Sequence, residues 1–157
     1  MSGSTNVPST ATRSRERDEL LGARVLVVDD DCALRKVMAV SLAERGCRVH
    51  QLGSGVDLTR VVETITTNAW PDEGVDLIVI DLKMPGIDGI EALRALRASG
   101  DSTPVLLITA FPEPEARSRA AALGIPLLAK PFRLSALLRR VEELTSGAAG
   151  RMDQRSV

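Results

Sequence analysis

A short stretch near the middle of the chain strongly limits what this sequence can fold into. The residues from Val75 to Ile80 form a mostly apolar run rich in Val and Ile, and Asp81 follows directly. Such a run is typical of a strand buried on both faces of a sheet. Pro85 and Gly86 then favour a rigid loop, and Asp88 is suited to the N-cap of a helix. The stretch therefore predicts a strand, a carboxylate at its end, a loop and a helix.

The same alternation of strand and helix patterns recurs along the chain. Apolar runs predict five strands, at about 24–28, 47–52, 75–80, 104–108 and 125–129. Apolar residues at helical spacing predict five helices, at about 32–45, 58–65, 88–98, 113–123 and 134–144. This order predicts an α/β fold, in which right-handed crossovers build a doubly wound parallel sheet covered on both faces.

Length and composition predict one globular domain and argue against some partners. The chain has 157 residues, of which 44% are hydrophobic and 26% charged. We predict a disordered tail over residues 1–22, a domain over 23–145 and a flexible tail over 146–157. A net charge of −1 and 2% aromatic residues favour neither nucleic acid nor membrane as a partner. Without a membrane-length apolar run, a signal core or metal-spaced cysteines, a cytoplasmic location is expected.

Polar residues follow four of the predicted strands. Asp29 to Asp31 follow the first, Asp81 the third, Thr109 the fourth and Lys130 the fifth. Because parallel strands end at the same edge of a sheet, these side chains are expected to meet there. Several carboxylates without His or Cys favour Mg²⁺ as a ligand. Asp81 could then act as a nucleophile and form an aspartyl-phosphate, with Lys130 and Thr109 contacting the phosphoryl oxygens.

Four motifs give the chain a resemblance to a known family. They are Val27-Val28-Asp29-Asp30-Asp31, Asp81-Leu82-Lys83-Met84-Pro85-Gly86-Ile87-Asp88-Gly89, Thr109-Ala110 and Lys130-Pro131-Phe132. In this order and at these separations, residues 24–145 resemble the receiver domain of two-component response regulators. The resemblance implies a flavodoxin-like fold with five parallel strands in the order 2-1-3-4-5.

The resemblance also implies a role for each residue of these motifs. Asp81 would accept a phosphoryl group from a sensor histidine kinase or a phosphotransfer protein. Mg²⁺ would be bound by Asp30, Asp81 and the backbone carbonyl of Lys83, with Asp29 assisting through a water molecule. Thr109 would sense the phosphoryl group and Lys130 would contact it. The Lys130–Pro131 peptide bond is often cis in this family.

The chain departs from the family pattern at three positions that modulate its chemistry or output. Leu127 stands where many receivers carry an aromatic switch residue. Lys83 lies two positions after Asp81, and Phe111 lies two after Thr109; in this family both positions tune phosphoryl hydrolysis. An ammonium at Lys83 would hold the phosphoryl group or pair with Asp81, and Phe111 would screen water. These residues predict slow self-dephosphorylation.

Several other residues have simpler structural interpretations. Asp31 is expected to do no more than cap the following helix. Cys32 is read as a small residue at the helix start rather than a redox group, and Cys47 as strand packing. His50 is expected to face solvent, and Trp70 to anchor its loop.

We therefore expect a stand-alone response regulator that does not turn over an external substrate. It would signal as a monomer or a phosphorylation-dependent homodimer, through its surface at about 104–140, to a separate effector protein. Three alternatives remain. The chain could be a pseudo-receiver scaffold that is not phosphorylated, or a receiver cut from a larger regulator. It could also be a haloacid-dehalogenase-like phosphatase, although such enzymes want a second Asp where Lys83 stands.

Overall fold

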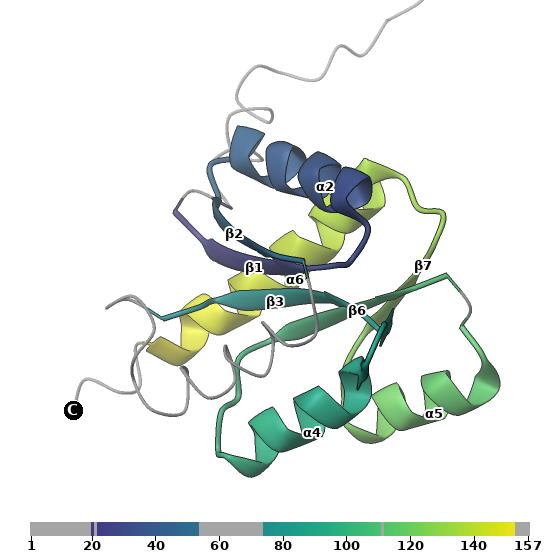
Figure 1. Cartoon of the computed structure of the whole chain (residues 1–157). Helices are drawn as coiled ribbons and strands as arrows, with labels where there is room; N and C mark the ends of the chain where they lie inside the picture. The colour runs from purple at the N-terminus through teal and green to yellow at the C-terminus, as the bar shows by residue number, and fades with distance from the viewer. Residues whose placement is uncertain (1–19, 21, 54–73, 111, 153–157) are drawn as a thin grey trace, which may run out of the picture.

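The computed structural model describes residues 20, 22–53, 74–110 and 112–152. Within these residues a central sheet consists of β1 (Arg24–Val28), β2 (Arg48–Leu52), β3 (Leu77–Asp81), β6 (Val105–Thr109) and β7 (Leu127–Ala129) (Figure 1). All neighbouring strands pair in parallel, in the order β2-β1-β3-β6-β7. This confirms the predicted five-stranded parallel sheet and the order 2-1-3-4-5. The helix predicted near 58–65 and the interpretation of Trp70 lie outside the described residues.

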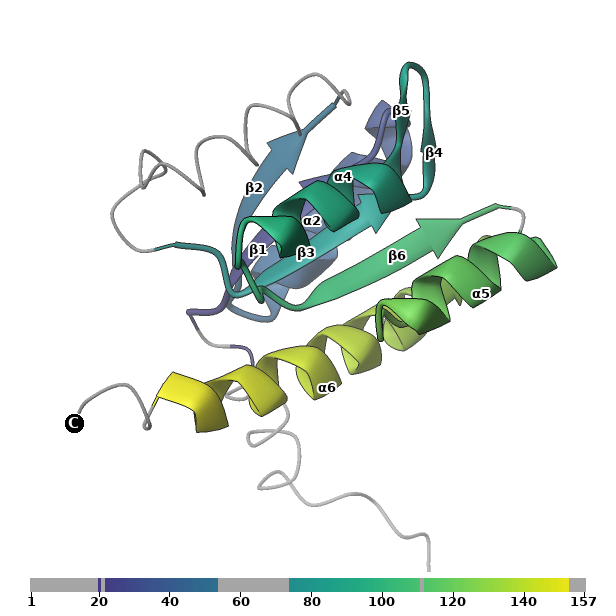
Figure 2. The same cartoon turned by 90° about the horizontal axis from the view of Figure 1, so that it is seen from below.

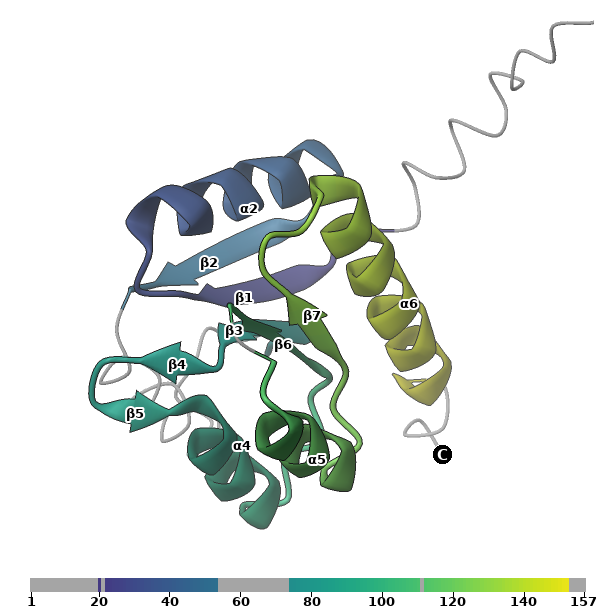
Figure 3. The same cartoon turned by 90° about the vertical axis from the view of Figure 1, so that its right-hand side faces the viewer.

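Among the described residues, two helices cover each face of this sheet. The helices α2 (Cys32–Glu44) and α6 (Leu134–Met152) lie on one face, and α4 (Gly89–Ala98) and α5 (Pro114–Ala122) lie on the other (Figure 3). The four lie where the pattern predicted helices, and α5 begins at Pro114, whose missing N–H costs nothing in a first turn. Helix α6 continues through Met152, so the expectation that the chain frays from Ser146 is wrong over that span.

Each face of the sheet has its own hydrophobic core, and alternate residues of the same strands supply the two. On β1, Val25 and Val27 pack with α2 and α6, whereas Leu26 and Val28 pack with α4 and α5. The same alternation continues along β3 and β6, because successive side chains of a strand point to opposite faces. The inner strands are therefore apolar throughout, which explains the continuous apolar runs in the sequence.

Leu20 packs with the domain although it lies before the predicted domain boundary. Leu20 was expected in the disordered tail, yet its side chain is fully buried in the core beneath α2 and α6. Its carbonyl oxygen accepts hydrogen bonds from the Ala23 N–H at 3.1 Å and from the Cys47 thiol at 3.8 Å. The predicted boundary between tail and domain at residue 22 therefore leaves out Leu20, which belongs to the domain core.

The segment after β3 is a short hairpin where a loop was predicted. Strands β4 (Lys83–Met84) and β5 (Ile87–Asp88) pair in antiparallel, and Gly86 in the turn adopts a φ of 84° (Figure 2). The last residue of this hairpin, Asp88, accepts a hydrogen bond from the Ile90 N–H at 2.9 Å and caps α4 as predicted. The hairpin thus connects Asp81 to the start of α4.

Candidate functional site

Three carboxylates and one lysine meet at the carboxyl end of the sheet. Asp29 follows β1, Asp81 is the last residue of β3, and Lys130 follows β7. The Lys130 Nζ lies 3.0 Å from Asp29 Oδ2 and 2.7 Å from Asp81 Oδ2. Carboxylate oxygens of Asp29, Asp30 and Asp81 lie within 4.8 Å of one another. The strand ends therefore bring these four predicted residues together, as their positions in the sequence indicated.

Asp29 is a buried carboxylate in a setting that disfavours its charge. None of its surface is exposed, and this burial raises the pKa of Asp29 above its usual value. Two contacts act in the opposite direction: the Asp31 N–H donates to Asp29 Oδ1 at 2.9 Å, and Lys130 donates to Oδ2. Because these contacts only partly offset the burial, Asp29 favours an additional cation nearby.

Lys130 is held in its charged form by the same carboxylates. Burial by itself would lower the pKa of Lys130, but its hydrogen bonds to Asp81 and Asp29 outweigh that effect and raise the pKa. The ammonium is therefore a fixed positive charge between two strand ends. The Lys130–Pro131 peptide bond is cis, as the family resemblance implied.

Both side-chain oxygens of Asp81 have hydrogen-bond donors. Oδ2 accepts from Lys130, and Oδ1 accepts from the Lys83 backbone N–H at 3.1 Å. The strand end is also closely packed: a Cβ on Gly89 would lie 3.0 Å from the Asp81 carbonyl oxygen. Asp81 is 7% exposed, so it stays accessible from solvent at the edge of the sheet while its orientation is restrained.

Thr109 and Leu127 lie on the two strands beside Asp81. Thr109 is the last residue of β6, next to Ile108, which is in register with Asp81 on β3. It is almost fully buried, and its carbonyl oxygen accepts a hydrogen bond from the Lys130 N–H at 2.7 Å. Leu127 begins β7 and packs against the core beneath α4 and α5. The predicted role of Phe111 lies outside the described residues.

Lys83 contacts a partner that the sequence did not indicate. Its ammonium was expected either to hold the phosphoryl group or to pair with Asp81, and the structure places its Nζ 3.4 Å from Glu113 Oε1. Its backbone N–H donates a hydrogen bond to Asp81 Oδ1 at 3.1 Å. Glu113 precedes α5, thirty residues further along the chain. No periodic pattern or motif could have identified this pair, because it depends on how the β4–β5 hairpin faces α5.

Arg35 is a second residue that the sequence did not indicate. It lies in α2, and its Nη1 donates a hydrogen bond of 2.6 Å to the Asp29 carbonyl oxygen. Its buried Nε has no partner among the described residues. A Cβ on Gly53 would lie 3.1 Å from Nη1, so the glycine after β2 leaves room for the guanidinium. Arg35 therefore holds the backbone that carries Asp29 and Asp30.

The residues given simpler interpretations lie largely where expected. Asp31 Oδ1 accepts hydrogen bonds from the N–H groups of Ala33 and Leu34 and caps α2. Cys32 is exposed at the start of α2, and His50 is exposed on β2. Cys47 is buried, and this burial raises the pKa of its thiol to about 11.

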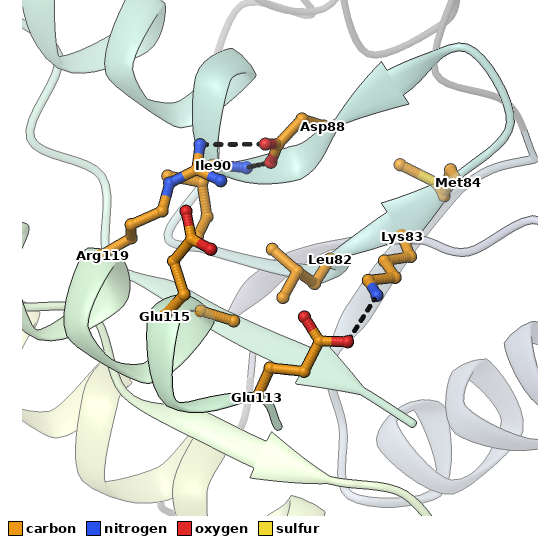
Figure 4. Close-up of a pocket in the computed structure, with 9 residues that line it drawn as sticks. Leu82, Lys83, Met84, Asp88, Ile90, Glu113, Glu115 and Arg119 are labelled. Atoms are coloured by element: carbon orange, nitrogen blue, oxygen red, sulfur yellow. Dashed lines mark hydrogen bonds and ion pairs between the residues drawn. The ribbon is translucent and has the colours of Figure 1, made fainter. Parts of the chain in front are cut away.

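A pocket of about 310 Å³ lies beside the site, between the β4–β5 hairpin and the start of α5 (Figure 4). Two ion pairs connect its opposite sides. Lys83 faces Glu113 at 3.4 Å, and Arg119 on α5 lies 2.9 Å from Asp88, the cap of α4. Glu115 also lines this pocket. Salt bridges therefore connect the hairpin that follows Asp81 to helix α5.

The donor set fits a magnesium ion. Three carboxylates offer hard oxygen ligands within reach of one common ion, and the cluster contains neither His nor Cys. Asp29 is buried with its charge only partly offset, so a divalent cation would relieve an existing cost. The residues present therefore match the ligand chemistry of Mg²⁺ better than that of zinc.

Comparison with known proteins identifies the class. The sequence model for the response regulator receiver domain matches residues 25–142, so the chain belongs to this family. Among curated proteins, the response regulator MprA of Mycobacterium ulcerans (strain Agy99) is 34% identical over 125 residues, covering 79% of this chain and 50% of that protein. MprA of Mycobacterium sp. (strain KMS) is 37% identical over 122 residues, covering 77% and 50%. The chain spans about half the length of these relatives.

Solved structures agree with this assignment. The receiver domain of the Francisella response regulator 1452 superposes with a TM-score of 0.68 at 29% identity, covering 80% of this chain and 98% of that chain. The chemotaxis response regulator CheY4 of Vibrio cholerae gives a TM-score of 0.64 at 27% identity, with coverage of 78% and 98%. Among the described residues, every helix is too short or too polar to span a membrane.

Proposed function

We propose that Asp81 accepts a phosphoryl group from a sensor histidine kinase or a phosphotransfer protein. The observation that carries this proposal is the ammonium of Lys130, which contacts both Asp29 and Asp81 at the end of the sheet. A carboxylate that is oriented, slightly exposed and next to a fixed cation is suited to attack phosphorus. Membership of the receiver family supports a phosphoacceptor role in two-component signalling.

Each residue of the site has a distinct part in this reaction. An oxygen of Asp81 forms the new bond to phosphorus as the bond from phosphorus to the donor nitrogen breaks. Lys130 then donates to a phosphoryl oxygen, and the Thr109 hydroxyl donates to another. Asp30, Asp81 and the Lys83 carbonyl would hold Mg²⁺, with Asp29 assisting through water. Bound there, Mg²⁺ would neutralise charge that develops on the phosphoryl oxygens.

Three residues would modulate the lifetime of the phosphoryl group and its output. Lys83 would approach the phosphoryl group and Phe111 would screen water, giving slow self-dephosphorylation as the only turnover. With Leu127 in place of an aromatic switch residue, the output would depend on shifts of α5, β7 and the start of α6. The chain would thus act as a phosphorylation switch that turns over no external substrate.

We further propose that the face formed by α5, β7 and the start of α6 binds a separate effector protein in the cytoplasm. The chain would act there as a monomer or as a phosphorylation-dependent homodimer. Neither nucleic acid nor membrane would be a direct partner. One observation favours a second arrangement: the chain spans about half the length of its MprA relatives. It could thus be the receiver part of a longer regulator. The mass of the endogenous protein, measured by immunoblot, distinguishes these arrangements.

The central test is an amide NMR titration with Mg²⁺ and beryllofluoride, a mimic of the phosphoryl group. We expect shifts near Asp81, Thr109 and Lys130 that extend into α5 and β7. The variant Asp81→Asn should show none of them while keeping a folded spectrum. A folded wild-type protein that gives no response would instead support a scaffold that is not phosphorylated.

A further inference from the structure

The salt bridge between Lys83 and Glu113 contains a glutamate with no role in helix capping. Glu113 occupies the N-cap position of α5, where a side chain often accepts a backbone hydrogen bond, but its side chain makes no such bond. Its carboxylate instead faces the Lys83 ammonium at 3.4 Å (Figure 4). Among the described residues, the Glu113 side chain therefore pairs with Lys83 rather than capping α5.

Lys83 is held close to the phosphoacceptor by its own backbone. Its N–H donates to Asp81 Oδ1 at 3.1 Å, and its neighbour Met84 pairs with β5 in the hairpin. This anchor fixes the base of the lysine side chain beside Asp81 while its four-carbon stem stays free to rotate. The Lys83 ammonium can therefore bind one of two anions, the Glu113 carboxylate or a group attached to Asp81.

We propose that Glu113 is a positioning residue that competes with the phosphoryl group on Asp81 for the Lys83 ammonium. This inference rests on the proposed function of Asp81. A phosphoryl group carries a charge of about −1.5 to −2 and three acceptor oxygens, whereas a carboxylate carries −1. The side chains of Lys83 and Glu113 are 59% and 61% exposed, and such exposed pairs are weak. The Lys83 ammonium therefore binds the phosphoryl group in preference to Glu113. Competition from Glu113 lowers the affinity of the site for the phosphoryl group.

The competition links the acceptor site to helix α5. When Lys83 turns to the phosphoryl group, the start of α5 loses the salt bridge of Glu113 to the hairpin, whereas the salt bridge between Arg119 and Asp88 remains. Linkage is reciprocal, so a partner that draws Glu113 away would strengthen phosphoryl binding by the same factor. Glu113 thus sets how strongly Asp81 and the start of α5 influence each other.

The test is the affinity for beryllofluoride in saturating Mg²⁺, measured from amide resonances of the full chain. We expect Glu113→Gln to raise this affinity about two- to fivefold, the range that a weak exposed pair supports. Glu115→Gln is the matched control, because Glu115 lines the same pocket with the same charge and lies two residues further on, in the first turn of α5. In a Lys83→Met background, Glu113→Gln should have no effect. Glu113→Ala serves as a second variant, and melting curves verify the fold.

The outcomes separate this proposal from the one on which it rests. If wild-type protein binds beryllofluoride and Asp81→Asn does not, the proposed function stands and the comparison of variants is meaningful. Equal effects of Glu113→Gln and Glu115→Gln would then overturn the competition, because general electrostatics would explain both. An effect that persists without Lys83 would overturn it as well. If wild-type protein fails to bind, the proposed function itself fails.

Discussion

Replacing Lys130 by methionine should reveal how much of the fold's stability depends on one cation. The substitution keeps an unbranched side chain of similar length and removes the charge that lies 3.0 Å from Asp29 and 2.7 Å from Asp81. The side chains of these carboxylates are 1% and 9% exposed, and that of Lys130 is 18% exposed. Two nearly buried carboxylates would then face each other without a neutralising partner.

The expected cost follows from the burial of the carboxylates. Removing one partner of a buried ion pair typically costs about 3–5 kcal/mol. Because Lys130 keeps some exposure, we expect the low end, about 3 kcal/mol, which is a large share of the roughly 5–15 kcal/mol that stabilises a typical domain. With a urea m-value of about 2 kcal/mol per M, the unfolding midpoint should fall by about 1.5 M. Lys36→Met, at an exposed position on α2, is the matched control.

The pH and Mg²⁺ dependence make this prediction specific. Burial already raises the pKa of Asp29 above its ordinary 3.8, and loss of Lys130 raises it further. A carboxyl with a raised folded pKa stabilises the fold below its unfolded pKa, and that contribution is lost as pH rises through the folded pKa. The deficit of the variant should therefore be smallest near pH 4 and largest near pH 7. Saturating Mg²⁺ should reduce it.

The reasoning would be refuted by a deficit that changes with neither pH nor Mg²⁺. Such a result would show that Lys130 acts through packing alone. A deficit below about 1 kcal/mol would equally refute it, since the carboxylates would then be adequately solvated without their cation.

Three further substitutions test other parts of the structure. Asp29→Asn removes a buried charge and should raise the free energy of unfolding by about 1–2 kcal/mol at pH 7. Calorimetry should show weaker Mg²⁺ binding, and an unchanged stability would contradict the assigned cost of burial. Gly89→Ala places a Cβ 3.0 Å from the Asp81 carbonyl and should cost about 1–3 kcal/mol in urea unfolding and weaken beryllofluoride binding, whereas a neutral result would mean that the hairpin yields easily. The Arg24 side-chain hydrogen bond lowers the pKa of Asp76, so this carboxylate stabilises the fold above pH 3.8, and that contribution is lost as pH falls through the lowered pKa. Asp76→Asn should thus destabilise by about 1 kcal/mol at pH 7 in urea melts, and its gap to wild type should narrow as the pH falls below 3.8; a constant gap would rule out the ion pair as its cause.

The meeting of Asp29, Asp81 and Lys130 could be predicted because it depends only on topology. Each residue lies at the end of an apolar run, and parallel strands end at one edge of a sheet whatever the details of their packing. The capping roles of Asp31 and Asp88 were equally accessible, since a cap is a local feature of four or five residues.

What the sequence did not reveal depends on contacts between distant segments. Leu20 and Leu21 form an isolated pair after a polar stretch, so no periodicity indicated that Leu20 would pack beneath α2 and α6. Glu113 and Lys83 meet only because the hairpin turns toward α5. The extension of α6 had only a weak signal in the sequence, because Gly147 and Gly150 disfavour a helix and the sole favourable sign is that no proline ends it. In the structure, Thr145 is buried and donates to the Val141 carbonyl at 2.8 Å within this helix.

The alternation of residues along the strands has a consequence for how such a protein can diversify. By the alternation along β3, Asp81 is on the same side of its strand as Leu77 and Val79, which pack with α2 and α6. On β6, Thr109 is on the same side as Val105 and Leu107, which pack with α4 and α5. Asp81 and Thr109 thus depend on different hydrophobic layers. Mutations that reshape α5 for a new partner leave the packing beneath Asp81 intact. Sequence changes on α5 that suit a new binding partner can therefore accumulate without repacking the residues that position Asp81.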